Sequence, residues 1–123
     1  MTARTFTVTH YARPSTMNYE RGTANRWAIA AATKEWRAAF ATLARQQHIP
    51  QLGPVDIVVE HETRTRRKVD TVACAPSYKA AQDGLRDAGV LVDDTPEFVR
   101  SVKFLPPHRT GRDAVSLTLT EVA

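Results

Sequence analysis

Apolar and polar residues alternate in four short segments of the chain, which is the pattern of half-buried β-strands. Residues 5–9 alternate threonines with two apolar side chains that share one face, Phe6 and Val8. Residues 55–62 are rich in β-branched side chains and predict a second strand. Residues 98–104 and 114–120 alternate again, and a loop rich in Pro, Gly and Arg joins these two predicted strands.

Two longer segments instead follow the 3.6-residue period of an amphipathic helix. The first spans about 25–46, and its apolar stripe should face the core: Ile29, Ala32, Trp36, Phe40 and Leu43. The second begins near Pro76, whose fixed φ suits a first helical position, and stops at Gly89. Its expected buried face consists of Tyr78, Ala81, Leu85 and Ala88. Gly84 inside this helix predicts close packing, and residues 13–22 are expected to form a loop.

The order strand, helix, strand, helix, strand, strand predicts an α+β fold. We expect one domain over residues 1–123, a mixed β-sheet with two helices packed on one face. The length of 123 residues suits a single domain, and no repeat or linker divides the chain.

Composition excludes several classes of protein. Apolar residues make up 42% of the chain, and no apolar run approaches the roughly 20 residues of a bilayer helix. The alternating start does not resemble a signal peptide, so we expect a cytoplasmic protein with no membrane partner. The single cysteine, Cys74, excludes an internal disulfide framework and is interpreted as a buried thiol. The histidines lack ligand spacing and the glycines are isolated, so neither a zinc site nor a phosphate loop for an organic cofactor is predicted.

Positive charge is concentrated in one short stretch. The chain has 17 Lys+Arg against 13 Asp+Glu, a formal net charge of +4. Four of five consecutive positions are basic: Arg64, Arg66, Arg67 and Lys68. Such a run raises local affinity for phosphate, although a solvated loop would have the same composition. Aromatic residues are not interleaved with the run, which argues against a single-strand binder that stacks bases.

Acidic residues flank the second predicted helix. Asp70 directly follows the basic run, and the pair Asp93–Asp94 follows a short apolar step after the helix. A strand end, a helix and a return to the sheet could bring Asp70 and Asp94 to one sheet edge. Carboxylates beside basic residues are what metal-assisted phosphodiester cleavage requires, because they bind Mg²⁺ while the cations hold the substrate.

Structural roles are open for the same residues. Residues 94–97 also read as a helix start, with Asp94 or Thr95 as the cap. Asp70 alone is compatible with a turn. Lys79 could be a solvated side chain that pairs with Asp83 one helical turn away.

The string from Arg64 to Asp94 resembles the RusA family of Holliday junction endonucleases. Three segments carry the resemblance: Arg-Thr-Arg-Arg-Lys-Val-Asp, Pro-Ser-Tyr-Lys-Ala-Ala-Gln-Asp-Gly-Leu, and Asp-Ala-Gly-Val-Leu-Val-Asp-Asp. They match a basic run that leads into an Asp-x-Asp-Asn motif, a helix with a lysine, and a Gly-apolar-Asp-Asp ending. The match is dense over about 30 residues, and Arg13-Pro14-Ser15 with Asn18 looks like a weakened form of the family's N-terminal Pro-Ser-Asn loop.

This resemblance implies a RusA-like fold and a homodimer that resolves branched double-stranded DNA by paired symmetric nicks. The implied cofactor is Mg²⁺ or Mn²⁺, bound by Asp70 and Asp94 with help from Asp93. Lys79 matches the helix lysine and would stabilise phosphate charge in the transition state. The implied DNA-binding residues are Arg64, Arg66, Arg67, Lys68, Arg13 and Asn18.

The sequence departs from the family pattern after Asp70. Val72 stands where the second aspartate would be, and Ala73 where the asparagine would be. Glu62 and Asp83 are the candidates for a substitute oxygen. We expect an active endonuclease, in a bacterial, phage or prophage setting. The alternative is a non-catalytic junction- or DNA-binding module on the same scaffold.

Overall fold

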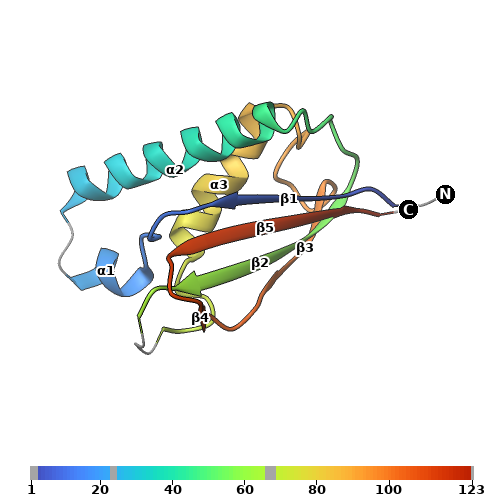
Figure 1. The fold of residues 1–123 in the computed structure, drawn as a ribbon. Helices are drawn as coiled ribbons and strands as arrows, with labels where there is room; N and C mark the ends of the chain where they lie inside the picture. The colour runs from blue at the N-terminus through green and yellow to red at the C-terminus, as the bar shows by residue number, and fades with distance from the viewer. Residues whose placement is uncertain (1–2, 23–24, 66–68, 123) are drawn as a thin grey trace.

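The computed structural model describes residues 3–22, 25–65 and 69–122. Within these residues three helices and one five-stranded mixed sheet form a single α+β domain (Figure 1). In chain order the elements are β1 (Thr5–His10), α1 (Met17–Gly22), α2 (Arg26–Gln46), β2 (Val55–Thr63), α3 (Ala75–Asp87), β3 (Val99–Phe104), β4 (His108–Arg109) and β5 (Ala114–Glu121).

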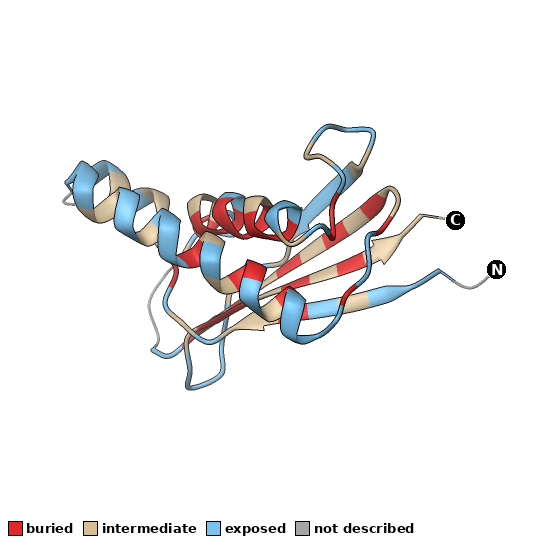
Figure 2. Cartoon of the chain, turned by 90° about the horizontal axis from the view of Figure 1, so that it is seen from above, coloured by how far each residue is buried: buried red, intermediate tan, exposed pale blue. Residues whose placement is uncertain are grey.

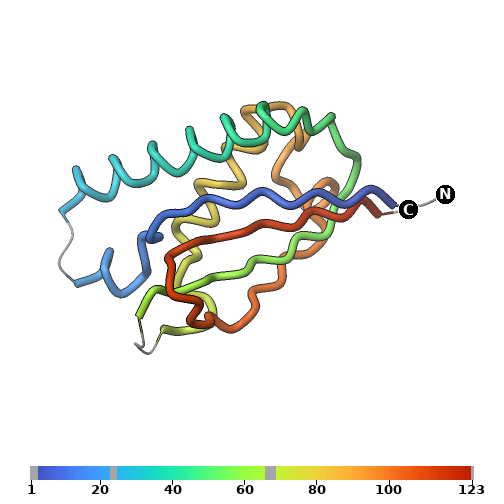
Figure 3. Tube along the Cα trace, in the orientation of Figure 1, coloured from blue at the N-terminus to red at the C-terminus, as the bar shows by residue number. Residues whose placement is uncertain are grey.

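The sheet has the strand order β1-β5-β2-β3, and β4 pairs with the end of β2. β5 is antiparallel to both of its neighbours, so β1 and β5 run side by side and the two ends of the chain lie close together (Figure 3). β2 and β3 are parallel, with α3 as the crossover between them. Because α3 runs back along the sheet, residues 64–65 and 69–74 lie at the end of the sheet where β2 ends, and residues 88–98 begin at the opposite end.

The two long helices, α2 and α3, cover one face of the sheet, as the sequence predicts (Figures 1 and 2). β2 alternates buried and half-buried residues along its whole length, and its buried side chains face the helices. Strands, helices and the loops between them contribute the largest fully buried apolar side chains: Phe40, Leu52, Ile57, Leu85, Leu91, Leu117 and Leu119. The sequence-predicted helix stripe is buried at Trp36 and Phe40 but only half-buried at Ile29 and Ala32, because the first turns of α2 extend beyond the sheet (Figure 2).

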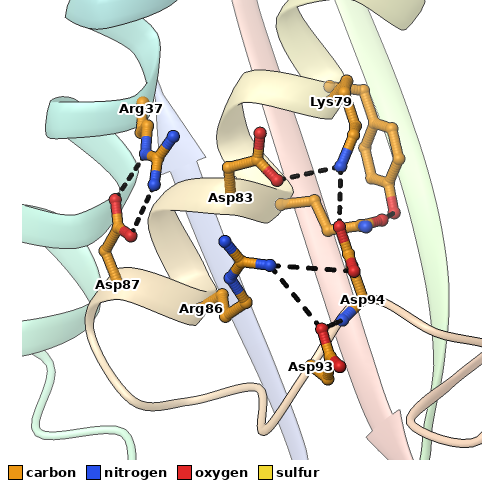
Figure 4. Close-up of polar contacts among 9 residues, drawn as sticks. Arg37, Lys79, Asp83, Arg86, Asp87, Asp93 and Asp94 are labelled. Carbon is orange, nitrogen blue, oxygen red and sulfur yellow. Dashed lines mark hydrogen bonds and ion pairs between the residues drawn. The ribbon is translucent and has the colours of Figure 1, made fainter.

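Local signals in the sequence set the helix ends. Asn25 Oδ1 accepts a hydrogen bond of 2.8 Å from the backbone N–H of Ala28 and caps α2. Gly89 ends α3 with φ of 79°, a conformation that favours glycine. Gly84 lies against the backbone of α2, which confirms the predicted close packing. Beside it, Arg37 of α2 holds Asp87 of α3 through two hydrogen bonds of 2.6 and 2.8 Å (Figure 4).

Two of the sequence predictions for local structure are wrong. Residues 17–22 form α1 rather than a loop, because Thr16 Oγ1 accepts a hydrogen bond from the N–H of Tyr19 and the N–H of Met17 donates to Ala73 O. Residues 94–97 do not start a helix. The N–H groups of Phe98 and Val99 both donate to the carbonyl of Thr95, which closes a turn before β3.

β4 was not expected either, because two residues are too few to show the alternating pattern by which a strand is predicted from sequence. No helix in the described part of the chain has the length and apolar character needed to cross a membrane.

Candidate functional site

A cluster of charged side chains lies on the exposed flank of α3. We call it the flank cluster; it consists of Lys79, Asp83, Arg86, Asp93 and Asp94 (Figure 4). Lys79 Nζ donates to Asp83 Oδ1 and to Asp94 Oδ2, both at 2.9 Å. The first contact joins residues one helical turn apart, whereas the second joins residues 15 positions apart. The fold therefore brings together two of the three segments that carry the family resemblance.

The loop after α3 places the acidic pair. The N–H of Val90 donates to Leu85 O, and Val90 O accepts from the N–H of Leu52, so the loop is fixed to the core before it reaches Asp93. Val90 and Leu91 are fully buried. The chain then returns along α3, and Asp93 Oδ1 accepts a 2.8 Å hydrogen bond from the N–H of Asp94. This return explains how Asp94, which follows the far end of α3, reaches the middle of the helix.

Arg86 is the second cation of the flank cluster, and the sequence reading overlooked it. Its Nη1 atom lies 3.6 Å from Asp93 Oδ1 and 3.8 Å from Asp94 Oδ1. The seven-residue spacing from Lys79 to Arg86 was a signal for this position, since i and i+7 share a helix face. Three carboxylates and two cations leave the flank cluster with a formal charge of −1.

The charges of the flank cluster reinforce one another. The pKa of Lys79 is raised, first by its hydrogen bond to Asp83 and then by the one to Asp94. Its ammonium group in turn lowers the pKa of Asp94, with a further contribution from Asp93. Lys79 is therefore a cation and Asp94 an anion at neutral pH.

Asp70 lies in a different place, at the end of the sheet where β2 ends. It is an exposed residue of the turn before α3, and its carbonyl accepts from the N–H of Ala73. A cavity of about 330 Å³ opens beside it, and Arg13 and Asn18 line the same cavity. Three of the sequence-predicted site residues thus gather here.

The segment that carries Arg13 is attached to α3. Ser77 Oγ accepts a 2.8 Å hydrogen bond from the N–H of Ser15 and donates to the Ser15 carbonyl. Pro14 is buried. This segment, the proposed counterpart of the Pro-Ser-Asn loop, forms the wall of the cavity and also lines a second, larger one of about 590 Å³ against α2.

The basic run continues from the end of β2. Arg64 is exposed, and its N–H donates to Asp113 Oδ1 at 3.2 Å. The other predicted DNA-binding residues of the run, Arg66, Arg67 and Lys68, lie outside the described residues.

The predicted metal ligands fall into two groups. Asp93 and Asp94 lie in the flank cluster, while Asp70 lies beside the cavity, and no hydrogen bond or ion pair among the described residues joins Asp70 to either of them. Within the same residues no three His, Cys, Asp or Glu side chains gather as a metal-binding group. Neither substitute ligand is free: Glu62 Oε1 is 3.3 Å from two nitrogens of Arg112, and Asp83 holds Lys79.

The donor chemistry of the acidic pair fits a divalent cation. Carboxylate oxygens are the ligands that Mg²⁺ prefers, and Asp94 keeps its charge because its pKa is lowered. Asp94 Oδ2 already accepts a hydrogen bond from Lys79, so a metal ion would share the Asp93–Asp94 pair with the ammonium group of Lys79.

No protein-family model matches the chain, and a search of curated proteins finds no relative. The function is therefore inferred from the site residues themselves.

Proposed function

We propose that this chain is a metal-dependent, structure-selective DNA endonuclease of the RusA type that resolves four-way junctions. The observation that carries the proposal is the 2.9 Å contact between Lys79 Nζ and Asp94 Oδ2. It joins the helix lysine of the resemblance to the late acidic pair, although 15 positions separate them. The shared cavity of Arg13, Asn18 and Asp70 gives further support, because it joins the N-terminal segment to the first acidic residue.

Each residue has a role that follows from its charge. Lys79 holds an ammonium group at the site and would stabilise the negative charge that develops on a phosphate. Asp94 and Asp93 would hold the metal ion, and Asp70, in the separate turn before α3, is the third proposed ligand. When bound, Mg²⁺ or Mn²⁺ supplies Lewis acidity and lowers the pKa of water. Arg13 and Arg64 would neutralise phosphates of the DNA backbone.

A homodimer follows from the substrate. A four-way junction has to be cut in two strands at symmetric positions, and a two-fold axis supplies two equivalent sites. The 123-residue chain carries one such set of residues.

A second candidate function is a non-catalytic junction-binding module, and the charge pairing of the flank cluster favours it. Lys79 and Arg86 already neutralise the carboxylates that would hold a metal. Val72, which is 43% exposed, stands where the family has a second aspartate. This module would bind junctions with strong salt dependence and would not cut them.

A nicking assay on synthetic four-way junctions distinguishes the two candidates. With Mg²⁺ or Mn²⁺ the endonuclease cuts two opposing strands, and Asp94→Asn, Asp70→Asn and Lys79→Met each reduce the rate strongly. Glu97→Gln is the matched control, because Glu97 is an exposed carboxylate of the same loop outside the flank cluster. Junction binding without cutting at any divalent ion supports the second candidate. Wild-type rates for Asp94→Asn and Asp70→Asn would show that these roles are wrong.

A further inference from the structure

An arginine lies over an exposed aromatic ring at the end of the sheet where β2 ends. The guanidinium carbon of Arg112 is 4.8 Å from the centroid of the Tyr11 ring. Tyr11 directly follows β1, and Arg112 lies two residues before β5, so the paired ends of these strands bring them together. Tyr11 is 64% exposed and lies outside the buried core, so its ring contributes little to the packing of the fold.

Glu62 fixes the position of Arg112. Its Oε1 atom lies 3.3 Å from both Nε and Nη2 of the guanidinium group. Glu62 is itself a residue of β2 with a largely buried side chain, 13% exposed. The arginine plane is therefore held over the ring before any ligand arrives, and less conformational entropy is lost on binding.

The surroundings of this pair are basic. Arg13, Arg64 and Arg109 are exposed near the same strand ends, and Figure 1 shows the ends of β1 and β2, the start of β5, and β4 gathered there beside α1. Of the acids nearby, Glu62 pairs with Arg112, and Asp113 Oδ1 accepts a hydrogen bond from the backbone N–H of Arg64. No ion pair within the described residues holds the side chains of Arg13, Arg64 or Arg109, so these arginines remain available for phosphates near the ring.

We propose that Tyr11 and Arg112 form a stacking platform for an unpaired nucleobase at the branch point of the DNA. A largely exposed ring with a cation fixed over one face offers its other face to any base, and the surrounding arginines retain the adjacent phosphates. Bases inside a duplex are stacked on their neighbours and cannot use it, whereas bases at a branch point can be unstacked at lower cost. This platform rests on the proposed function for its DNA substrate. It adds residues that recognise the branched structure of the DNA and that are distant in the sequence from the acidic residues.

The test compares Tyr11→Ala with Tyr11→Phe, which retains the ring. Binding is measured by fluorescence anisotropy on a four-way junction and on a linear duplex of the same sequence, with far-UV circular dichroism to verify folding. Tyr11→Ala should weaken junction binding by roughly 5- to 150-fold, the range expected for loss of one base–aromatic stack, and leave duplex binding within about twofold. Tyr11→Phe should bind both like the wild type. Trp27→Ala, which removes a ring 76% exposed on α2, should change neither.

A second readout reports stacking directly. The fluorescence of 2-aminopurine at the branch point should be quenched by the wild type and by Tyr11→Phe but not by saturating Tyr11→Ala. Wild-type junction affinity for Tyr11→Ala, or an equal loss on junction and duplex, would overturn the platform alone. A wild-type protein that binds no DNA would overturn the platform and the proposed function together.

Discussion

Gly84 is a residue at which α3 packs directly against the backbone of α2, and its replacement by alanine tests how the site helix is held. A Cβ atom at this position would lie 2.2 Å from the carbonyl oxygen of Arg37 and 3.1 Å from the backbone nitrogen of Ala41. Both neighbours are backbone atoms, so no side-chain rotation relieves the overlap. The two helices would have to separate by more than about 1 Å to restore an ordinary van der Waals contact at the Arg37 carbonyl oxygen.

Two opposing effects set the size of the change. Alanine is favoured over glycine inside a helix by about 0.5–1 kcal/mol. Overpacking a tightly packed contact costs about 1–3 kcal/mol, and a contact with rigid backbone belongs at the upper end. We expect Gly84→Ala to lower the free energy of unfolding by about 2 kcal/mol, which is a fall in Tm of roughly 6–12 °C for a domain of this size.

Urea unfolding followed by circular dichroism measures this difference. The control is Gly22→Ala, because Gly22 also lies in a helix and a Cβ there meets no atom within 4 Å. Gly22→Ala should leave the stability unchanged or raise it slightly. A Gly84→Ala protein as stable as the wild type would refute the inferred helix contact. Because α3 carries Lys79, the same variant should also disturb the flank cluster and slow any nicking.

Three further predictions test individual residues. Val72→Asp places a carboxylate at the exposed position where the family pattern has its second aspartate. This variant should raise the rate of Mg²⁺-dependent nicking roughly tenfold or more over Val72→Asn. Equal rates for the two variants would contradict a ligand role for position 72. Lys79 lowers the pKa of Asp94 from its ordinary value of 3.8, so the wild type should be more stable than Asp94→Asn at neutral pH. The two urea midpoints should converge as the pH falls below 3.8 towards the lower folded pKa, and a difference that stays constant or grows as the pH falls would contradict this linkage. Burial raises the pKa of Cys74 to about 11. Iodoacetamide at about pH 8 should therefore alkylate the thiol of the native protein about a hundredfold more slowly than the thiol of the unfolded protein. Equal alkylation rates would show that the native thiol is accessible.

The helices and strands could be predicted from the sequence because their signals are local. Asn25 and Gly89 end their helices through contacts within a few residues, and the alternation in β2 directly reports one buried face. α1 escaped the same reading because its support is remote: the N–H of Met17 donates to the carbonyl of Ala73, 56 positions later. β4 is likewise held by pairing with β2 and not by its own two residues.

The candidate site was only partly predictable for a related reason. Sequence order identified Lys79, Asp93 and Asp94, and their contacts follow from the return of the chain along α3. The sequence shows an apolar step at Val90 and Leu91, but not that its burial would turn the chain back along α3. The pairing of Tyr11 with Arg112 depends on the register of β1 and β5, which joins His10 to Val115. Aromatic and basic residues that are far apart in the sequence therefore become neighbours in the fold.

The crossover from β2 through α3 to β3 imposes a geometric condition on any catalysis. Asp70 precedes α3 and Asp94 follows it, so the two enter from opposite ends of the helix, and only the return of the loop along α3 brings Asp94 back towards Asp70. The ion pair with Lys79 holds Asp94 at this intermediate position. A metal ion that competes for Asp94 would release the ammonium group of Lys79, and that group would then be free to contact a phosphate beside the ion. The charge pairing of the flank cluster is thus compatible with a resting site in which the ammonium group of Lys79 is exchanged for a metal ion. The comparison of Lys79→Met with Asp94→Asn tests this exchange. Lys79→Met should bind Mn²⁺ more tightly than the wild type and cut more slowly, and weaker Mn²⁺ binding in Lys79→Met would exclude the exchange.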